Sequence, residues 1–488
     1  MSGAVTPARP GRFFADVRLL VVARGAMILL QAASLPILAR LLSVEDFAIV
    51  ALGMAVPLFA NAFSDAGMGR SLIRTGGFNA EEWSSVFWFL AALGLALALV
   101  VAAIAPLYAR AMGQPQLVAV MLLLATVPLM QSAMSTQQAA LERAGRFRPV
   151  AAIGVAAGLA GVATALGLAL AGFGYWALVW QQVVLAGVKL GGFALLSGFR
   201  PQWVLRWPLL RPHLLFGRNT LLFSGVQTLQ TQVPVLALGA GPGAAAVSLW
   251  SMAERVARLP RMGLAGPLSQ VAMVTMARQW HGEEGPAGVS RSWRAASRVL
   301  ATLLLPGFAV LALNGVPVFT VLLSEPWGAA APLFALAAPA FAIEALASLG
   351  ARVFMVADRT GLRLQSAIER LVIGGGLFLL ALPLGLGLAI ALRSAFALAY
   401  LPRYWGFLGR CVPLTNWQAA EPLLGPALCG LGVGLLLRVA VLPGIGSAVA
   451  ATAVVVLGGA AAVALCAALN RRALKSDIAW LQKPRAAH

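Results

Sequence analysis

The sequence has few acidic residues, few histidines and few cysteines. Of its 488 residues, only 16 are aspartate or glutamate, and 11% are charged, whereas soluble domains contain about 25% charged residues. The three cysteines lack the spacing of a metal or redox motif. The histidines fall in predicted loops or at the end of the chain, at His213, His281 and His488. We therefore expect no metal site and no cofactor.

Long hydrophilic segments and catalytic motifs are also missing. No loop has room for a soluble domain, and the sequence contains no GxSxG, HExxH or Walker motif. These absences argue against an enzyme. A membrane polysaccharide polymerase or ligase is a less favoured alternative, because it would need a long outer loop with catalytic residues.

Apolar sequence makes up most of the chain. Hydrophobic residues account for 60% of it, the mean hydropathy is +0.87, and runs of about 20 apolar residues recur from end to end. This pattern predicts an all-α polytopic membrane protein. Fourteen transmembrane helices are expected, at 17–39, 45–64, 84–108, 116–138, 149–171, 175–197, 214–238, 244–277, 297–321, 328–350, 367–387, 388–407, 422–441 and 445–468.

The basic residues predict the orientation of the chain. The formal net charge is +20, but the arginines are spread over short loops and lie mostly on one side of the predicted membrane. This asymmetry is typical of the positive-inside rule and places both termini in the cytoplasm. We expect no nucleic-acid partner, because the charge is not gathered on a polar domain.

Two similar halves explain most of the predicted helices. A weak repeat relates 39–56 to 239–256, and the Pro- and Arg-rich loop 198–213 is the expected linker. We predict an N-lobe of six helices at 1–212, a C-lobe of six helices at 213–412, and two further helices with a cytoplasmic tail at 413–488. Repeats of this kind occur in secondary transporters, with the substrate site between them, so a central cavity is expected.

The strongest functional signal lies in the eighth predicted span, at 244–277. Arginine at membrane depth costs about 2.5–3.5 kcal/mol on insertion scales and therefore indicates function. On one helix Glu254, Arg258 and Arg261 would share a face, and Pro260 is expected to kink or break the helix. Either Glu254 and Arg258 simply pair locally, or these residues and Arg255 form a basic face for an anion such as pyrophosphate, which we favour.

Other polar residues inside spans are further candidates for the cavity. Arg24 lies in the first span with Gln31 on nearly the same face, and either reaches the cytoplasmic interface or serves as a cavity cation. Gln227 and Gln230 belong to a polar patch in the seventh span. Such a patch either joins helices or lines a cavity that binds sugar hydroxyl groups.

Two acidic residues are candidate coupling sites. Asp65 follows the second span and is expected either to pair locally with Arg70 or to take part in coupling. Glu344 lies in the tenth span. It is either a proton or cation coupling site or a structural partner of an arginine such as Arg352.

Several segments resemble one family of transporters. ILARLLSVEDFAIVAL (37–52) and FSDAGMGRSLIR (63–74) resemble the opening signature of bacterial polysaccharide flippases, and 172–184 and 248–260 also match. These flippases belong to the multidrug/oligosaccharidyl-lipid/polysaccharide exporter superfamily. The segment SLWSMAERVARLP also resembles the eighth helix of the related peptidoglycan-lipid flippases. By that match, Glu254 and Arg255 would line a central cationic cavity.

The resemblance implies a function and a location. It implies a bacterial inner-membrane flippase that moves an undecaprenyl-diphosphate-linked oligosaccharide by alternating access, for exopolysaccharide or lipopolysaccharide biosynthesis. The expected partners are this lipid-linked substrate, membrane lipids and other polysaccharide-assembly proteins. The diphosphate would contact Arg24, Arg255 and Arg258. The nearest alternative is a multidrug or cation antiporter of the same superfamily, whose cavity should be acidic rather than basic.

Overall fold

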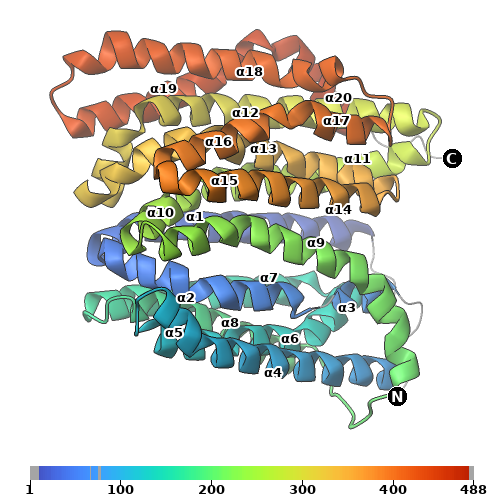
Figure 1. Cartoon of the computed structure of the whole chain (residues 1–488). Helices are drawn as coiled ribbons and strands as arrows, with labels where there is room; N and C mark the ends of the chain where they lie inside the picture. The colour runs from blue at the N-terminus through green and yellow to red at the C-terminus, as the bar shows by residue number, and fades with distance from the viewer. Residues whose placement is uncertain (1–9, 66, 75–77, 483–488) are drawn as a thin grey trace. The chain divides into compact units, whose positions relative to one another are not determined.

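The computed structural model describes residues 10–65, 67–74 and 78–482 (Figure 1). Over these ranges the chain consists of helices, turns and irregular segments, without a strand. The prediction of an all-α fold is therefore confirmed. The chain divides into two compact units, Met1–Ser248 and Leu249–His488, which are described separately below. The lobe boundaries expected at 212/213 and 412/413 stay predictions.

The first unit is built from long apolar helices. In it α7 packs on α1 and α8, and α6 packs on α4. The start of α2 is fixed by a capping box, in which the Ser43 hydroxyl accepts from the Asp46 N–H and the Asp46 carboxylate accepts from the Ser43 N–H. The helices are α1 (Pro10–Leu41), α2 (Val44–Phe63), α3 (Met68–Arg74), α4 (Ala80–Ala111), α5 (Leu117–Leu124), α6 (Thr126–Arg143), α7 (Phe147–Leu170), α8 (Trp176–Leu196) and α9 (Trp207–Ala240).

The second unit is arranged around α12, which packs on α13, α18, α19 and α20. Its helical segments are α10 (Ala244–Pro260), η1 (Arg261–Ala265), α11 (Gly266–Trp280), α12 (Gly285–Leu323), η2 (Glu325–Ala329), α13 (Ala330–Val356), α14 (Thr360–Glu369), η3 (Arg370–Gly374), α15 (Gly375–Ala381), η4 (Leu382–Leu384), α16 (Leu386–Ala399), α17 (Leu401–Gly409), α18 (Asn416–Leu436), η5 (Leu437–Val441), η6 (Leu442–Gly444), α19 (Ala448–Leu469) and α20 (Arg471–Gln482). The first residues of α10 belong to the first unit.

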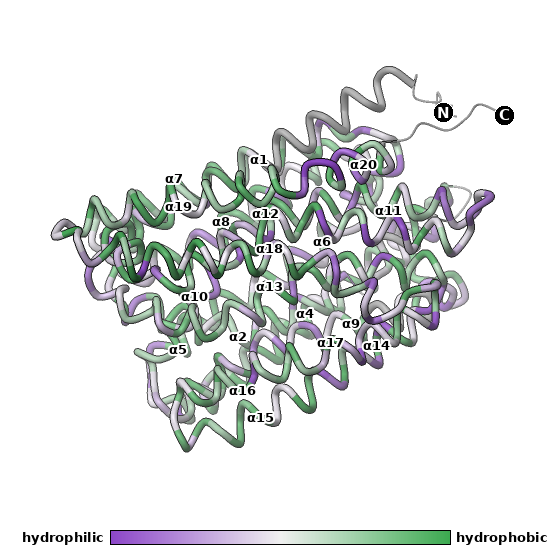
Figure 2. Tube along the Cα trace, turned by 90° about the horizontal axis from the view of Figure 1, so that it is seen from above, coloured by the Kyte–Doolittle hydropathy of each residue, from purple (hydrophilic) through white to green (hydrophobic). Residues whose placement is uncertain are grey.

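The protein is a multi-pass membrane protein. Among the described residues, 11 helices are long and apolar enough to cross a membrane, and hydrophobic residues dominate most of their length (Figure 2). Helices also cover the three other predicted spans, as α1, α9 and the series α10–η1–α11. The total of fourteen membrane crossings stays a prediction.

Two irregularities interrupt the regular α-helices, and the sequence predicts the first of them at Pro260. The α-helix of α10 ends at Pro260, and the chain continues without a break as the π-helical turn η1, so the irregularity expected there is a change of helix type. Farther along, α15 and α16 are separated by Gly385, whose φ of 134° favours glycine because it carries no Cβ. Three consecutive glycines, Gly374, Gly375 and Gly376, lie within η3 and α15 and do not end the helical segment.

The segment 198–206 packs against α4 through hydrogen bonds and an aromatic contact. The Ser84 hydroxyl accepts from the N–H of Gln202 at 3.0 Å, and the Trp88 indole donates to the Gln202 carbonyl at 2.7 Å. The rings of Trp88 and Trp203 stack with centroids 4.1 Å apart. These contacts order the Pro- and Arg-rich segment that leads into α9.

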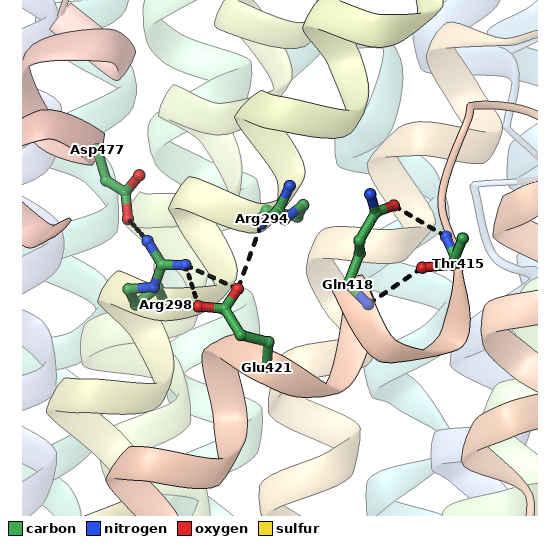
Figure 3. A network of polar contacts seen from close by, with 6 residues as sticks. All are labelled: Arg294, Arg298, Thr415, Gln418, Glu421 and Asp477. Carbon is green, nitrogen blue, oxygen red and sulfur yellow. Dashed lines mark hydrogen bonds and ion pairs between the residues drawn. The ribbon is translucent and has the colours of Figure 1, made fainter.

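A charged network holds the last helix, α20, against the second unit (Figure 3). Arg298 of α12 contacts Asp477 of α20 at 2.7 Å and Glu421 of α18 at 2.8 Å, while Arg294 contacts Glu421 at 3.3 Å. Two arginines thus face two carboxylates, so the formal charges of this network balance. Nearby, the Trp480 indole donates to the hydroxyl of Ser292 at 3.1 Å.

The two partners in this network should respond differently to mutation. Burial raises the pKa of Asp477 above its usual range, although Arg298 opposes the shift. A raised pKa in the folded protein means that the contribution of Asp477 to stability falls as pH rises through that pKa. At neutral pH we therefore expect Asp477→Asn to leave α20 docked. Arg298→Ala should loosen it, because two carboxylates lose their shared cation. Hydrogen exchange of α20, compared at one pH, measures both effects.

The control for this prediction is Lys475→Ala, since Lys475 is exposed on the same helix. It should exchange like the parent protein. Equal loosening by Asp477→Asn and Arg298→Ala would contradict the unequal roles assigned to the two residues.

Candidate anion-binding site

The charged residues of α10 and η1 form two separate groups. Glu254 and Arg258 pair within α10, with 2.8 Å between Oε1 and Nη2. Arg261, the first residue of η1, instead contacts Glu344 of α13 at 2.9 Å. The local Glu254–Arg258 pair anticipated from the four-residue spacing is therefore present. The three residues therefore do not act as one face, because Arg258 pairs with Glu254 whereas Arg261 pairs with Glu344.

Glu344 bridges two arginines from different segments. Its Oε2 atom contacts Arg261 Nη1 of η1 at 2.9 Å, and its Oε1 atom contacts Arg393 Nη2 of α16 at 3.3 Å. The exposed fractions of these side chains are 31% for Glu344, 27% for Arg261 and 16% for Arg393. The cluster is therefore accessible in part and is not sealed within helix packing. We call these three residues the Glu344 cluster.

An aromatic wall orients one side of the Glu344 cluster. The Arg393 guanidinium lies 5.5 Å from the centroid of the Trp250 ring, within the range of a cation–π interaction. Trp250 is buried and packs against Phe341 and Phe378, with ring centroids 5.7 and 6.4 Å away. Because these rings fix Trp250, they also restrict the position of Arg393.

The segment around the cluster has an excess of positive charge. Arg255 is partly buried and lies next to Glu254 on α10. Together with the Glu254–Arg258 pair and the Glu344 cluster, it gives four arginines against two glutamates. Arginine has a planar fork of donors that matches phosphate oxygens, so this composition suits a phosphate-bearing anion.

Glu344 pairs with arginine, which is one of the two alternatives predicted for it, and a coupling role stays a prediction. Its arginine partners are Arg261 and Arg393, from segments far away in the sequence. Arg393 is not among the predicted site residues, so its contact with Glu344 was missed. The available signal was a single arginine inside the otherwise apolar segment 386–399.

Asp65 has a local hydrogen-bonding role at the start of α3. Its carboxylate accepts from the Ser135 hydroxyl of α6 and from the Gly69 N–H at 3.2 Å. One residue earlier, the Ser64 carbonyl accepts from Ser132 at 2.9 Å. Ser132 and Ser135 of α6 therefore join this helix to the chain between α2 and α3. The side chain of Arg70 lies outside the described residues, and a coupling role for Asp65 stays a prediction.

The remaining predicted site residues belong to the first unit. Gln31 on α1 and Gln227 on α9 are exposed, while Gln230 is partly buried. The side chain of Arg24 lies outside the described residues. These four residues and the Glu344 cluster therefore belong to different compact units, and their common role in one site stays a prediction.

The prediction that His213 lies in a loop is wrong. It lies in α9, where its side chain is 1% exposed. Its Nδ1 atom is 2.7 Å from Ser71 Oγ of α3, and its Nε2 atom is 2.8 Å from Glu82 Oε1 of α4. Pro208 and Pro212 suggested a loop, but Pro208 occupies the first turn of the helix, where the missing N–H costs little.

A comparison with known families identifies the chain. The family model described as "Polysaccharide biosynthesis protein" matches residues 37–332, more than half of the sequence. The chain belongs to this family. The resemblance indicated by the segments 37–52 and 63–74 is therefore confirmed.

The chain is similar in sequence to a transport protein. The chain is 28% identical over 311 residues to the succinoglycan biosynthesis transport protein ExoT of Rhizobium meliloti (strain 1021). The match covers 63% of this chain and 62% of ExoT, so it spans less than two thirds of that relative.

Solved structures with the same fold are flippases and exporters. The lipid II flippase MurJ in an inward closed conformation matches with a TM-score of 0.70 at 12% identity, over 95% of this chain and 99% of that one. An inward-facing MATE multidrug transporter of the MOP superfamily matches with a TM-score of 0.61 at 16% identity, over 79% of this chain and 98% of that one. This family member therefore shares its fold with these two proteins.

Proposed function

We propose that the protein is a flippase for an undecaprenyl-diphosphate-linked oligosaccharide, acting by alternating access in the bacterial inner membrane with both termini in the cytoplasm. The observation that supports this most is the excess of arginine around Glu344, in a membrane protein of the polysaccharide biosynthesis family. The product would serve exopolysaccharide or lipopolysaccharide synthesis. Other assembly proteins are proposed partners.

The charge of the site fits the charge of this cargo. A diphosphate is an anion with several oxygen acceptors, and arginines provide paired donors for them. Arg255 and Arg258 are proposed to contact the diphosphate from α10, with Arg24 contributing from α1. Gln31, Gln227 and Gln230 are proposed to bind sugar hydroxyl groups. The membrane potential supplies about 2.3 kcal/mol per unit charge per 100 mV, which can drive the return step.

A cation antiporter is the competing function within this fold. Such a transporter needs acidic groups to receive its cargo, and the described charges of the α10–η1 region are in excess basic. A carboxylate already engaged by two arginines, as in Glu344, is a poor cation receptor. The electrostatics therefore favour an anionic cargo.

Reconstitution tests the proposed function directly. Purified protein in liposomes should move a fluorescent undecaprenyl-diphosphate-linked disaccharide between leaflets, as measured by the fraction that dithionite quenches from outside. Protein-free liposomes give the background rate. Transport of the cationic dye ethidium without movement of the lipid probe would support the antiporter instead.

Arg255→Ala should slow movement of this probe about tenfold. Hydrogen bonds to charged groups contribute about 1.5–3 kcal/mol, and about 1.4 kcal/mol corresponds to a factor of ten. The matched control is Arg438→Ala, because Arg438 is exposed and its guanidinium donates to the Leu313 carbonyl at 2.8 Å. Undiminished flipping by Arg255→Ala would remove Arg255 from the proposed diphosphate site.

A further inference from the structure

Two glutamates of the second unit each bridge a pair of arginines, but their surroundings differ. Glu421 lies between Arg294 and Arg298, and Asp477 supplies a second carboxylate to Arg298 (Figure 3). Glu344 lies between Arg261 and Arg393. Within the described ranges, no second carboxylate contacts either of the latter two arginines. The Glu421 network is thus balanced in charge, whereas the Glu344 cluster has one more cation than anion.

The contacts of Glu344 are those that a phosphate group would make. Each carboxylate oxygen meets a different guanidinium, at 2.9 and 3.3 Å. A phosphate group offers more oxygens and more negative charge to the same two donors. A phosphate group would therefore neutralise the positive charge that remains when the single carboxylate of Glu344 faces two arginines. The partial exposure of all three side chains allows an exchange of partners without unpacking the helices.

We propose that Glu344 is an internal substitute for a phosphate group. Without cargo, its carboxylate holds Arg261 and Arg393 together and keeps their like charges from separating them. When cargo arrives, a phosphate oxygen displaces the carboxylate and takes over both arginines. The site is assigned to a phosphate-bearing headgroup, and its identification as the diphosphate of the lipid-linked cargo rests on the proposed function.

The exchange has a consequence for affinity and release. Cargo must compete with Glu344 for the two arginines. The apparent affinity for cargo is therefore reduced, because only the fraction of protein whose arginines are not held by the carboxylate is ready to bind. The same competition favours release, because the carboxylate returns as the phosphate leaves. Glu344 thus acts by positioning the two arginines. We expect it to weaken the binding of cargo and to speed its release.

Variants of Glu344 test the substitute role by binding. For purified protein in zwitterionic nanodiscs, we measure the Kd of undecaprenyl diphosphate by tryptophan fluorescence. Glu344→Gln should bind about tenfold more tightly than the parent, because the competing anion is gone. Glu344→Asp keeps the charge and therefore the fold, but it is too short to bridge both arginines and should bind about threefold more tightly. Both variants should also move the lipid probe between leaflets more slowly, because they release cargo more slowly.

The matched control is Glu421→Gln. It also removes a carboxylate from between two arginines and changes the net charge equally, but Arg298 keeps Asp477. Its Kd should equal that of the parent. Equal tightening by Glu421→Gln would show a general charge effect and overturn the proposal. Parent affinity in both Glu344 variants would also overturn it while leaving the proposed function in place.

Two further probes separate the sources of the phosphate group. Inorganic pyrophosphate tests the headgroup alone, and nanodiscs with cardiolipin test a membrane phospholipid. Tighter pyrophosphate binding by Glu344→Gln, without binding of undecaprenyl diphosphate by any variant, would support the substitute role and contradict the proposed function. Competition by cardiolipin as strong as that by undecaprenyl diphosphate would overturn the assignment to cargo.

Discussion

Replacing Arg261, Glu344 and Arg393 together with glutamine should slow flipping about 100-fold and leave the folded protein about as stable as its parent. Each arginine lost removes a charged hydrogen bond of about 1.5–3 kcal/mol to the diphosphate. Two such losses exceed about 2.8 kcal/mol, which corresponds to a factor of 100. Stability should be retained because all three charges are removed together, so that no uncompensated charge is left within the cluster.

This triple variant separates transport from folding more clearly than any single change. Arg393→Gln alone would leave an unbalanced cluster, and lost activity could then reflect misfolding. The measurements are the dithionite assay in liposomes and the thermal unfolding midpoint in detergent. The control is Glu369→Gln with Arg403→Gln, which neutralises an ion pair of 2.6 Å in the same unit. It should flip normally, and normal flipping by the triple variant would rule out the Glu344 cluster as the diphosphate site.

The second large effect concerns stability. His213→Ala is expected to lower the unfolding free energy by about 2–4 kcal/mol, because it leaves the buried Ser71 and the partly buried Glu82 without their shared partner and opens a cavity. For a unit of this size, the unfolding midpoint should fall by about 5–10 °C. Tryptophan fluorescence during heating in detergent provides the measurement.

His281→Ala is the control for His213, since His281 is exposed after α11. Its midpoint should match that of the parent. A midpoint unchanged by His213→Ala would mean that the bonds joining α3, α4 and α9 contribute little to the first unit.

The fold was predictable where hydropathy alone decides it. The runs that became α4, α7, α8, α12 and α19 are long and apolar, and a chain in lipid must satisfy its backbone within such helices. Local rules also sufficed at Pro260, where regular α-helix ends. His213 was misplaced because prolines are compatible with both a loop and the first turn of a helix.

The candidate site was predictable only in part. The pairing of Glu254 with Arg258 follows from helical spacing alone. The pairing of Arg261 with Glu344 joins residues 83 positions apart and depends on how η1 packs against α13. Arg393 was missed for the same reason, since its partners Glu344 and Trp250 lie on other segments. Pairwise contacts between distant helices are not encoded in the periodicity of either helix.

The π-helical turn after Pro260 changes the phase of the segment it joins. A π-helix forms hydrogen bonds from residue i to i+5, so each turn contains more residues than an α-helical turn. Side chains before and after η1 therefore cannot be placed on one helical wheel. Arg258 pairs with Glu254 within α10, whereas Arg261 pairs with Glu344 of α13. In relatives with the same turn, charged positions beyond the proline should be assigned partners from a wheel restarted at η1.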